Sequence, residues 1–374
     1  MKKMLSLAAM FAALSYASPA FADLNISGDA SVRVQDWITG NQANDNVDWQ
    51  YRLRLKAAAD LGDGYFFKAL VSNELPSRDL AGKGAGNGGN GGWQTVGYGN
   101  TEVYNLQLSN FYFGHMSECN HYMIGRLPLN SANNPVFDLT LYPTQPLNTP
   151  VALIDLDRVY GANVGGKVGP GDLNATFVVL DNNQAGNTAA SGDGLLNDGY
   201  ALLGSYKFNI GNVTFDPEIL TILTKSDVFQ QYQSADGNFF SPLHQEFRPF
   251  TYGANVSVPV SGVKLSASAF FTRGSSSANS VDYFGDFFRI KGESGPFTVW
   301  YDHNSTTDKS SGPSYVFTNN FVWAQYKINV YQSAKGSFSV QPTVRYLSSK
   351  VSNANVTLAD EHILLPELWA TVSF

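Results

Sequence analysis

The segment from His115 to Met123 concentrates side chains that could bind a soft metal ion. His115, Cys119 and His121 supply imidazole and thiol groups, which are ligands for Zn²⁺ and copper. Their spacing matches no structural zinc pattern, and the segment is typical of a turn between two strands. The sequence therefore favours an ordinary turn with one free thiol, and it predicts no metal site.

Two other motifs resemble ligand sites but lack the context that such sites need. Gly84 to Gly89 formally matches the nucleotide-binding loop G-x-G-x-x-G, but no strand–helix unit surrounds it. Asp193, Asn197 and Asp198 could coordinate Ca²⁺, although solvated polar side chains are common in loops. No nucleophile–base pair is recognisable. The sequence thus predicts no cofactor and does not suggest an enzyme.

A further set of candidates consists of cations at alternate positions of apolar–polar segments. Arg52, Arg54 and Lys56 alternate with apolar residues between positions 49 and 58, and Arg33 is placed in the same way between 25 and 35. Successive side chains of a strand point to opposite faces of the sheet. Each group of cations therefore shares one face, and its role depends on what that face meets.

The alternation recurs along the whole chain after residue 22, and no helical period of comparable length accompanies it. Seven short turns rich in Gly, Asp, Asn, Ser or Pro alternate with eight long polar connections, which predicts sixteen strands. Four prolines, at 217, 259, 342 and 366, lie inside expected strands, where bulges or earlier strand ends could accommodate them. The expected strands are 25–37, 49–60, 64–74, 101–113, 121–127, 157–168, 172–181, 199–210, 212–225, 249–260, 263–273, 281–291, 296–303, 319–332, 337–348 and 362–374.

Composition excludes several classes of protein. Aromatic residues make up 13% of the 374 residues, and there is one Cys, so the chain is neither disordered nor a disulfide scaffold. One apolar stretch approaches membrane-spanning length, and it lies at the N-terminus, which excludes a helical membrane protein. A net charge of −7 makes nucleic acid an improbable partner.

Strands of this length and even number fit a membrane. Ten-residue strands tilted near 45° cross the apolar layer, and an even antiparallel set can close without a free edge. We therefore expect an all-β fold, a transmembrane antiparallel β-barrel of sixteen strands with its apolar face on lipid. A soluble β-sandwich or a secreted β-solenoid remains the alternative.

The N-terminus has the features of an export signal. Lys2 and Lys3 precede an apolar stretch from Leu5 to Tyr16, and residues 20–22 form a small-x-small cleavage site. We expect residues 1–22 to be a signal peptide and residues 23–374 to form the barrel. An N-terminal membrane helix is the less favoured interpretation.

The last strand carries a family resemblance. Phe374, Val372, Ala370 and Leu368 alternate with Thr371 and other residues on the opposite face. A terminal Phe on such a strand resembles the assembly signal of Gram-negative outer-membrane barrels. With the signal peptide and the strand count, the whole mature chain resembles a general-diffusion porin.

The resemblance implies a homotrimer of water-filled channels whose third long loop, here 127–156, folds into the lumen. That loop contains four prolines, which suit a loop that must hold its shape. In the resembled family, cations on the early barrel wall face acids on this loop. The corresponding residues here are Arg33, Arg52, Arg54, Lys56, Lys68 and Arg126 on the wall, opposed by Asp138, Asp155 and Asp157.

The expected function is passive diffusion of small hydrophilic solutes and ions across the outer membrane of a Gram-negative-type bacterium. The resemblance also implies outer-membrane lipid, lipopolysaccharide and the barrel-assembly machinery as partners. A channel selective for sugars, phosphate or another anion is the alternative, which a lumenal ladder of aromatics or lysines would mark; Phe321 and Trp323 are candidates. An outer-membrane enzyme or adhesin is a third, less favoured class.

Overall fold

The computed structural model describes residues 23–39, 42–73, 93–96, 106–128, 158–181, 199–223, 250–276, 281–309, 314–353 and 356–374. These stretches are almost entirely β-strand, as the period of two predicts. Among them, no helix is long and apolar enough to cross a membrane. The strands are β1 (Asp23–Thr39), β2 (Gln42–Gly62), β3 (Tyr65–Ser72), β4 (Gln94–Thr95), β5 (Gln107–Met116), β6 (Asn120–Pro128), β7 (Arg158–Val168), β8 (Gly171–Asp181), β9 (Gly199–Ile210), β10 (Val213–Ile222), β11 (Phe250–Val260), β12 (Val263–Ser276), β13 (Val281–Ser294), β14 (Phe297–Asp308), β15 (Tyr315–Tyr326), β16 (Ile328–Ser333), β17 (Gly336–Asn353) and β18 (Val356–Ser373).

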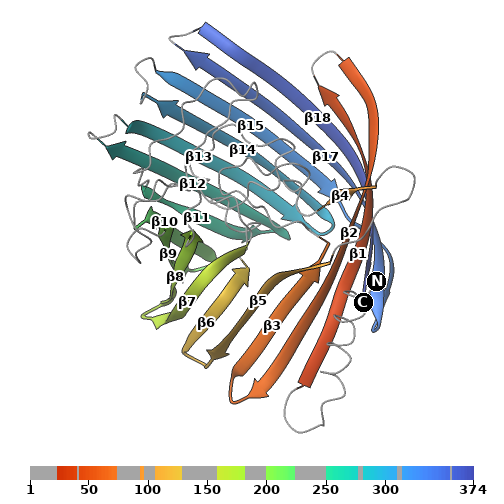
Figure 1. Ribbon diagram of the computed structural model, residues 1–374, viewed down its shortest axis with the longest axis vertical. Helices are drawn as coiled ribbons and strands as arrows, with labels where there is room; N and C mark the ends of the chain where they lie inside the picture. Colours follow the sequence, from red (N-terminus) through yellow and green to blue (C-terminus); the bar gives the residue numbers. More distant parts are fainter. Residues whose placement is uncertain are drawn as a thin grey trace, which may run out of the picture.

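The strands close into an antiparallel barrel, in which the last strand pairs with the first (Figure 1). The two-residue β4 pairs with β2 and is not counted as a separate barrel strand. β16 continues β15 beyond Lys327, since both of them pair with β17. The remaining segments form the closed sixteen-strand antiparallel barrel that the sequence predicts. In the described part of the chain, each barrel strand therefore has a paired neighbour on both sides, as a lipid environment requires.

All seven predicted short turns join consecutive strands. The β11–β12 hairpin shows their chemistry, because Ser261 (φ 48°) and Gly262 (φ 85°) both have positive φ. This is the geometry of a type I′ turn, whose twist matches that of the flanking strands. The turns lie at the end of the barrel where Ser373 pairs with Asp29.

The four strand prolines do not end their strands. Pro342 pairs with Leu368 and Pro366 pairs with Val344, both in uninterrupted register between β17 and β18. Pro217 also pairs with Ala254 of β11, while the register between β10 and β9 skips the position of this proline. The ladder is therefore interrupted on one side of Pro217, since proline cannot donate a hydrogen bond.

The two faces of the barrel differ in polarity. Val32 is 44% exposed and Trp49 is 56% exposed, whereas Arg33 is 1% exposed. Alternate residues therefore point outward as an apolar surface, and those between them point into the lumen. The four longest strands, β17, β18, β1 and β2, are consecutive around the ring and have 18, 18, 17 and 21 residues.

Candidate functional site in the barrel lumen

The cations predicted on β1 and β2 project from the inward-pointing face. Arg33 shares its face with Asp29, whereas Val32 faces out. The register pairs Asp29 with Arg54, so the Arg52–Arg54–Lys56 row shares that face. Lys68 pairs with Ala58 at the next position of the same row, and its Nζ lies 5.2 Å from the ring centroid of Phe66. These five residues thus have the inward orientation that the alternation predicts.

Arg126 does not belong to this row. It pairs with Tyr160 of β7, and its guanidinium carbon lies 5.4 Å from the centroid of that ring. Tyr160 is exposed on the outer face, as is Ile124 two residues before Arg126. The expectation that Arg126 faces the lumen is therefore wrong, because the parity of β6 places it on the outer side.

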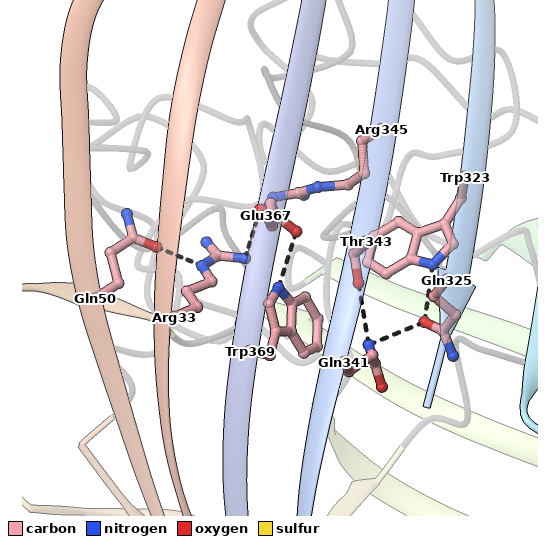
Figure 2. Close-up of polar contacts among 9 residues, drawn as sticks. All are labelled: Arg33, Gln50, Trp323, Gln325, Gln341, Thr343, Arg345, Glu367 and Trp369. Atoms are coloured by element: carbon pink, nitrogen blue, oxygen red, sulfur yellow. Dashed lines mark hydrogen bonds and ion pairs between the residues drawn. The ribbon is translucent and has the colours of Figure 1, made fainter. Parts of the chain in front are cut away.

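An ion cluster spans the closure between β1 and β18 (Figure 2). Arg33 Nη1 lies 3.2 Å from Glu367 Oε1, and Arg345 Nη2 of β17 donates to the same oxygen. Arg33 Nε donates to Gln50 Oε1 of β2 at 2.7 Å, and Trp369 Nε1 donates to Glu367 Oε2 at 3.0 Å. Both carboxylate oxygens of Glu367 are therefore engaged, which is the condition for burying a charge at tolerable cost.

Wall carboxylates also face other lumenal cations. Arg54 Nε lies 2.9 Å from Asp29 Oδ1, within the pair of strands that opens the chain. Arg289 of β13 makes two hydrogen bonds to Asp302 of β14, and both side chains are buried. Sequence reasoning missed Asp29, Asp302 and Glu367 as partners, although each falls on the inward face by the same alternation.

Tryptophans from four segments meet on this wall. The indoles of Trp300 and Trp323 stack with their centroids 4.7 Å apart and an interplanar angle of 11°. Trp369 meets Trp323 edge-on at 5.9 Å, and Trp93 lies 5.2 Å from Trp369. The sequence indicated Trp323 as a lumenal aromatic, and Phe321 on the same face of β15 packs against it. The four rings form a continuous aromatic cluster, which we call the tryptophan cluster.

Trp93 reaches the lumen from a segment that was expected to be part of a long loop. It precedes the short strand β4, which pairs with Gln50 and Tyr51 of β2. The guanidinium carbons of Arg33 and Arg52 lie 4.6 Å and 4.7 Å from the centroid of its ring. Trp93 is 2% exposed, so it is held between two cations and Trp369. Its isolation within a glycine-rich stretch gave no signal of this role.

A cavity of about 330 Å³ adjoins the tryptophan cluster. Trp300, Trp323 and Trp369 contribute its aromatic wall, and the amides of Gln325 and Gln341 lie between them. Arg52, Arg289 and Lys291 contribute its cationic side. The cavity can therefore offer a solute an apolar surface and hydrogen-bonding groups at the same place.

The two histidines of the candidate metal site around Cys119 lie on opposite faces of the barrel wall. His115 faces outward beside Tyr65 and its Nε2 contacts the carbonyl oxygen of Asp63, whereas His121 contacts Asn163. In the described part of the chain, no three His, Cys, Asp or Glu side chains are placed to hold a metal ion. Cys119 is exposed in the turn between β5 and β6.

Several predicted features lie outside the described residues. These are the signal peptide 1–22, most of loop 127–156 and the acids Asp138, Asp155 and Asp157. The candidate assembly signal is described: Leu368 and Val372 are exposed on the outer face, and the backbone of Phe374 exchanges two hydrogen bonds with Gly28. Ala370 pairs with Val32 on that same face.

No family model and no curated protein matches the sequence. Solved structures match it in three dimensions at low identity. The trimer form of OmpT, an outer membrane protein of Vibrio cholerae, has a TM-score of 0.58 and 8% identity, covering 95% of this chain and 100% of that one. The anion-selective porin of Comamonas acidovorans has a TM-score of 0.57 and 9% identity, covering 94% and 100%. The chain has the fold of an outer-membrane porin.

A further solved structure with a similar fold is described as a channel. The outer membrane channel DcaP of Acinetobacter baumannii has a TM-score of 0.53 and 12% identity, covering 96% of this chain and 99% of that one. A closed barrel with an apolar outer face and this likeness indicate a protein of the Gram-negative outer membrane.

Proposed function

We propose that the chain forms a water-filled channel for passive diffusion of small hydrophilic solutes and ions, without enzymatic activity. The observation that carries this proposal is the polar inner face of a closed barrel whose outer face is apolar. Ionised side chains are tolerated on such a face when water or opposite charges reach them. Lys56 is exposed and the side chain of Arg54 is 30% exposed, as residues beside an aqueous lumen would be.

The proposal includes a constriction between the inward cations and the third long loop. Arg33, Arg52, Arg54, Lys56 and Lys68 form the wall side. Asp138 and Asp155 of the loop, with Asp157 just beyond it, form the opposite side. Export through the signal peptide 1–22, assembly of the barrel through the last strand, contact with lipopolysaccharide and a homotrimeric state complete the proposal. The trimer form of the OmpT neighbour supports the last of these.

Conductance in planar lipid bilayers tests the proposal. Protein refolded without residues 1–22 is expected to insert as long-lived, ohmic conductance steps in KCl solution. Chain that has folded, judged by its heat-dependent mobility on gels, but that adds no conductance would contradict a channel. Crosslinking before electrophoresis tests the trimer separately, because a monomeric barrel could still conduct.

A substrate-selective channel is the second candidate function. The tryptophan cluster and the adjoining cavity favour it, because a purely passive pore has no need of an aromatic surface in its lumen. Flux that saturates with solute concentration would distinguish this candidate from passive diffusion, in which flux rises in proportion to concentration.

A further inference from the structure

We propose that the cavity beside the tryptophan cluster is a binding subsite for a neutral saccharide passing through the lumen. This inference rests on the proposed channel function and names the substrate class that the channel prefers. The cavity volume, about 330 Å³, falls within the usual range for small-molecule sites.

The aromatic wall offers the apolar surface that a sugar ring needs. Trp300 and Trp323 are 7% and 3% exposed and are stacked on one another, so they form a rigid base. Trp369 is only partly buried, and it projects beside Gln341 (Figure 2). Its indole is the ring most available to the C–H face of a saccharide, while its N–H is already used by Glu367.

The amides beside the rings offer hydrogen bonds to hydroxyl groups. Gln325 Oε1 accepts from Trp323 Nε1 at 2.8 Å and from Gln341 Nε2 at 3.2 Å, which fixes the orientation of both amides. Among the described residues, Gln325 Nε2 and Gln341 Oε1 have no partner, so one donor and one acceptor remain available. A hydroxyl group can satisfy either of them.

A buried donor on the cavity wall points to the same kind of ligand. In the described part of the chain, the indole N–H of Trp300 has no hydrogen-bond partner, although the residue is 7% exposed. A buried donor without a partner destabilises the fold, and most such groups in proteins are satisfied by a ligand, water or neighbouring residue. A saccharide hydroxyl in the cavity supplies an acceptor.

Two of the three cations that line the cavity, Arg289 and Lys291, already have carboxylate partners, which favours a neutral ligand over an anion. Arg289 is engaged by both oxygens of Asp302, and Lys291 Nζ lies 3.1 Å from Glu293 Oε1. Glu293 also lies within 3.9 Å of Lys264. An anion would have to compete with these carboxylates, whereas a polyhydroxyl compound can hydrogen-bond to both members of each pair.

Sugar block of the ion current tests the proposal. Channels reconstituted in planar bilayers are titrated with glucose and with maltose while the KCl current is recorded. We expect a saturable reduction of the current by at least one of the two sugars, and no comparable saturable block by sodium phosphate at matched ionic strength. Block by phosphate alone would overturn the proposal in favour of an anion subsite.

Three variants locate the block. Trp300→Phe keeps an aromatic ring and removes the unsatisfied N–H, so the half-blocking sugar concentration should rise about threefold to tenfold. Gln341→Ala should raise the half-blocking sugar concentration by a similar factor. This variant keeps the proposal testable should Trp300→Phe fail to fold. Trp49→Phe, on the exposed outer face, is the matched control and should leave both block and conductance unchanged.

The outcomes separate this inference from the proposed function. Channels that conduct KCl but show no sugar block, or that show equal block in the wild-type and all three variant proteins, would overturn the saccharide subsite and leave the channel function standing. Folded protein that conducts no ions would overturn both.

Discussion

Arg33 on the first strand contacts Glu367 on the last strand, with 3.2 Å between Nη1 and Oε1, inside the barrel. The same carboxylate receives Arg345 from the other side. One acid therefore connects three consecutive strands across the closure. Because the cluster forms only when β1 and β18 meet in the correct register, it reports that the barrel has closed correctly.

Replacing the shared acid should destabilise the closed barrel. Glu367→Gln leaves two buried arginines without a carboxylate, which we expect to cost about 3–5 kcal/mol of unfolding free energy. Urea titration in detergent micelles measures the loss. Glu293→Gln, which removes a half-buried acid with lysine partners, is the control and should cost less than about 1 kcal/mol. Equal losses of unfolding free energy in the two variants would show that the buried Glu367 cluster stabilises the barrel no more than a partly exposed ion pair does.

The assignment of faces predicts that the same substitution to arginine destabilises the barrel to different extents at two adjacent residues of β11. Val256 pairs with Ala267 on the outer face, and Ser257 pairs with Ser266 on the inner face. Val256→Arg should lower the unfolding free energy by about 2–4 kcal/mol in a bilayer, and Ser257→Arg by much less. Folding titrations in lipid vesicles provide the comparison. If Ser257→Arg proved the more damaging, the two faces would have to be exchanged.

The inward cations should influence ion selectivity. Arg52→Ser combined with Arg54→Ser removes two positive charges and leaves Asp29 without its arginine. The reversal potential in a KCl gradient should therefore shift toward cation preference. Lys335→Ser, in the exposed turn between β16 and β17, is the control. An unchanged reversal potential in the double variant would remove these arginines from the selectivity determinants.

The constriction proposed for the third long loop gives a separate prediction. Deleting residues 138–148 should raise the single-channel conductance, because a loop that narrows the lumen limits the current. Bilayer recording of single insertions makes the measurement. A deletion of equal length in the long connection 224–249 is the control. Wild-type conductance in the 138–148 deletion would place the narrowest part of the lumen elsewhere.

The single cysteine reports the orientation of the barrel. Cys119 lies in an exposed short turn, at the end where Ser373 pairs with Asp29. Short turns of such barrels face the periplasm. A membrane-impermeant maleimide should therefore label Cys119 only after the outer membrane is permeabilised. Ser234→Cys in a Cys119→Ser background, placed in a long connection, should be labelled on intact cells. The reverse pattern would invert the topology.

The fold was predictable because it depends on local periodicity. The alternation and turn residues predicted the strand count, and the observed β9 has the predicted limits, 199–210. The segment 319–332 is instead divided at Lys327 into β15 and β16, and β17 continues to Asn353. Strand ends depend on pairing with neighbours, so local patterns define them poorly.

The site was only partly predictable, because it depends on register between distant strands. Parity alone placed Arg33, Arg52 and Arg54 on the inner face. The partnership of Arg33 with Glu367 requires β1 to align with β18, which a single strand's sequence does not specify. Arg126 was misassigned although Tyr122 and Ile124 already indicated an outward parity. Trp93 lay in a stretch without periodicity, where alternation gives no information.

The barrel wall is tallest where the four long strands β17, β18, β1 and β2 lie next to one another. A strand of 18 residues, tilted near 45°, rises roughly 40 Å, while the apolar band of an outer-membrane barrel is about 25 Å tall. The part of these strands that exceeds the apolar band forms a paired β-sheet extension beyond the membrane on one side of the barrel. A solute approaching from outside therefore meets an oblique entrance with a stiff rim on the side of the ion cluster.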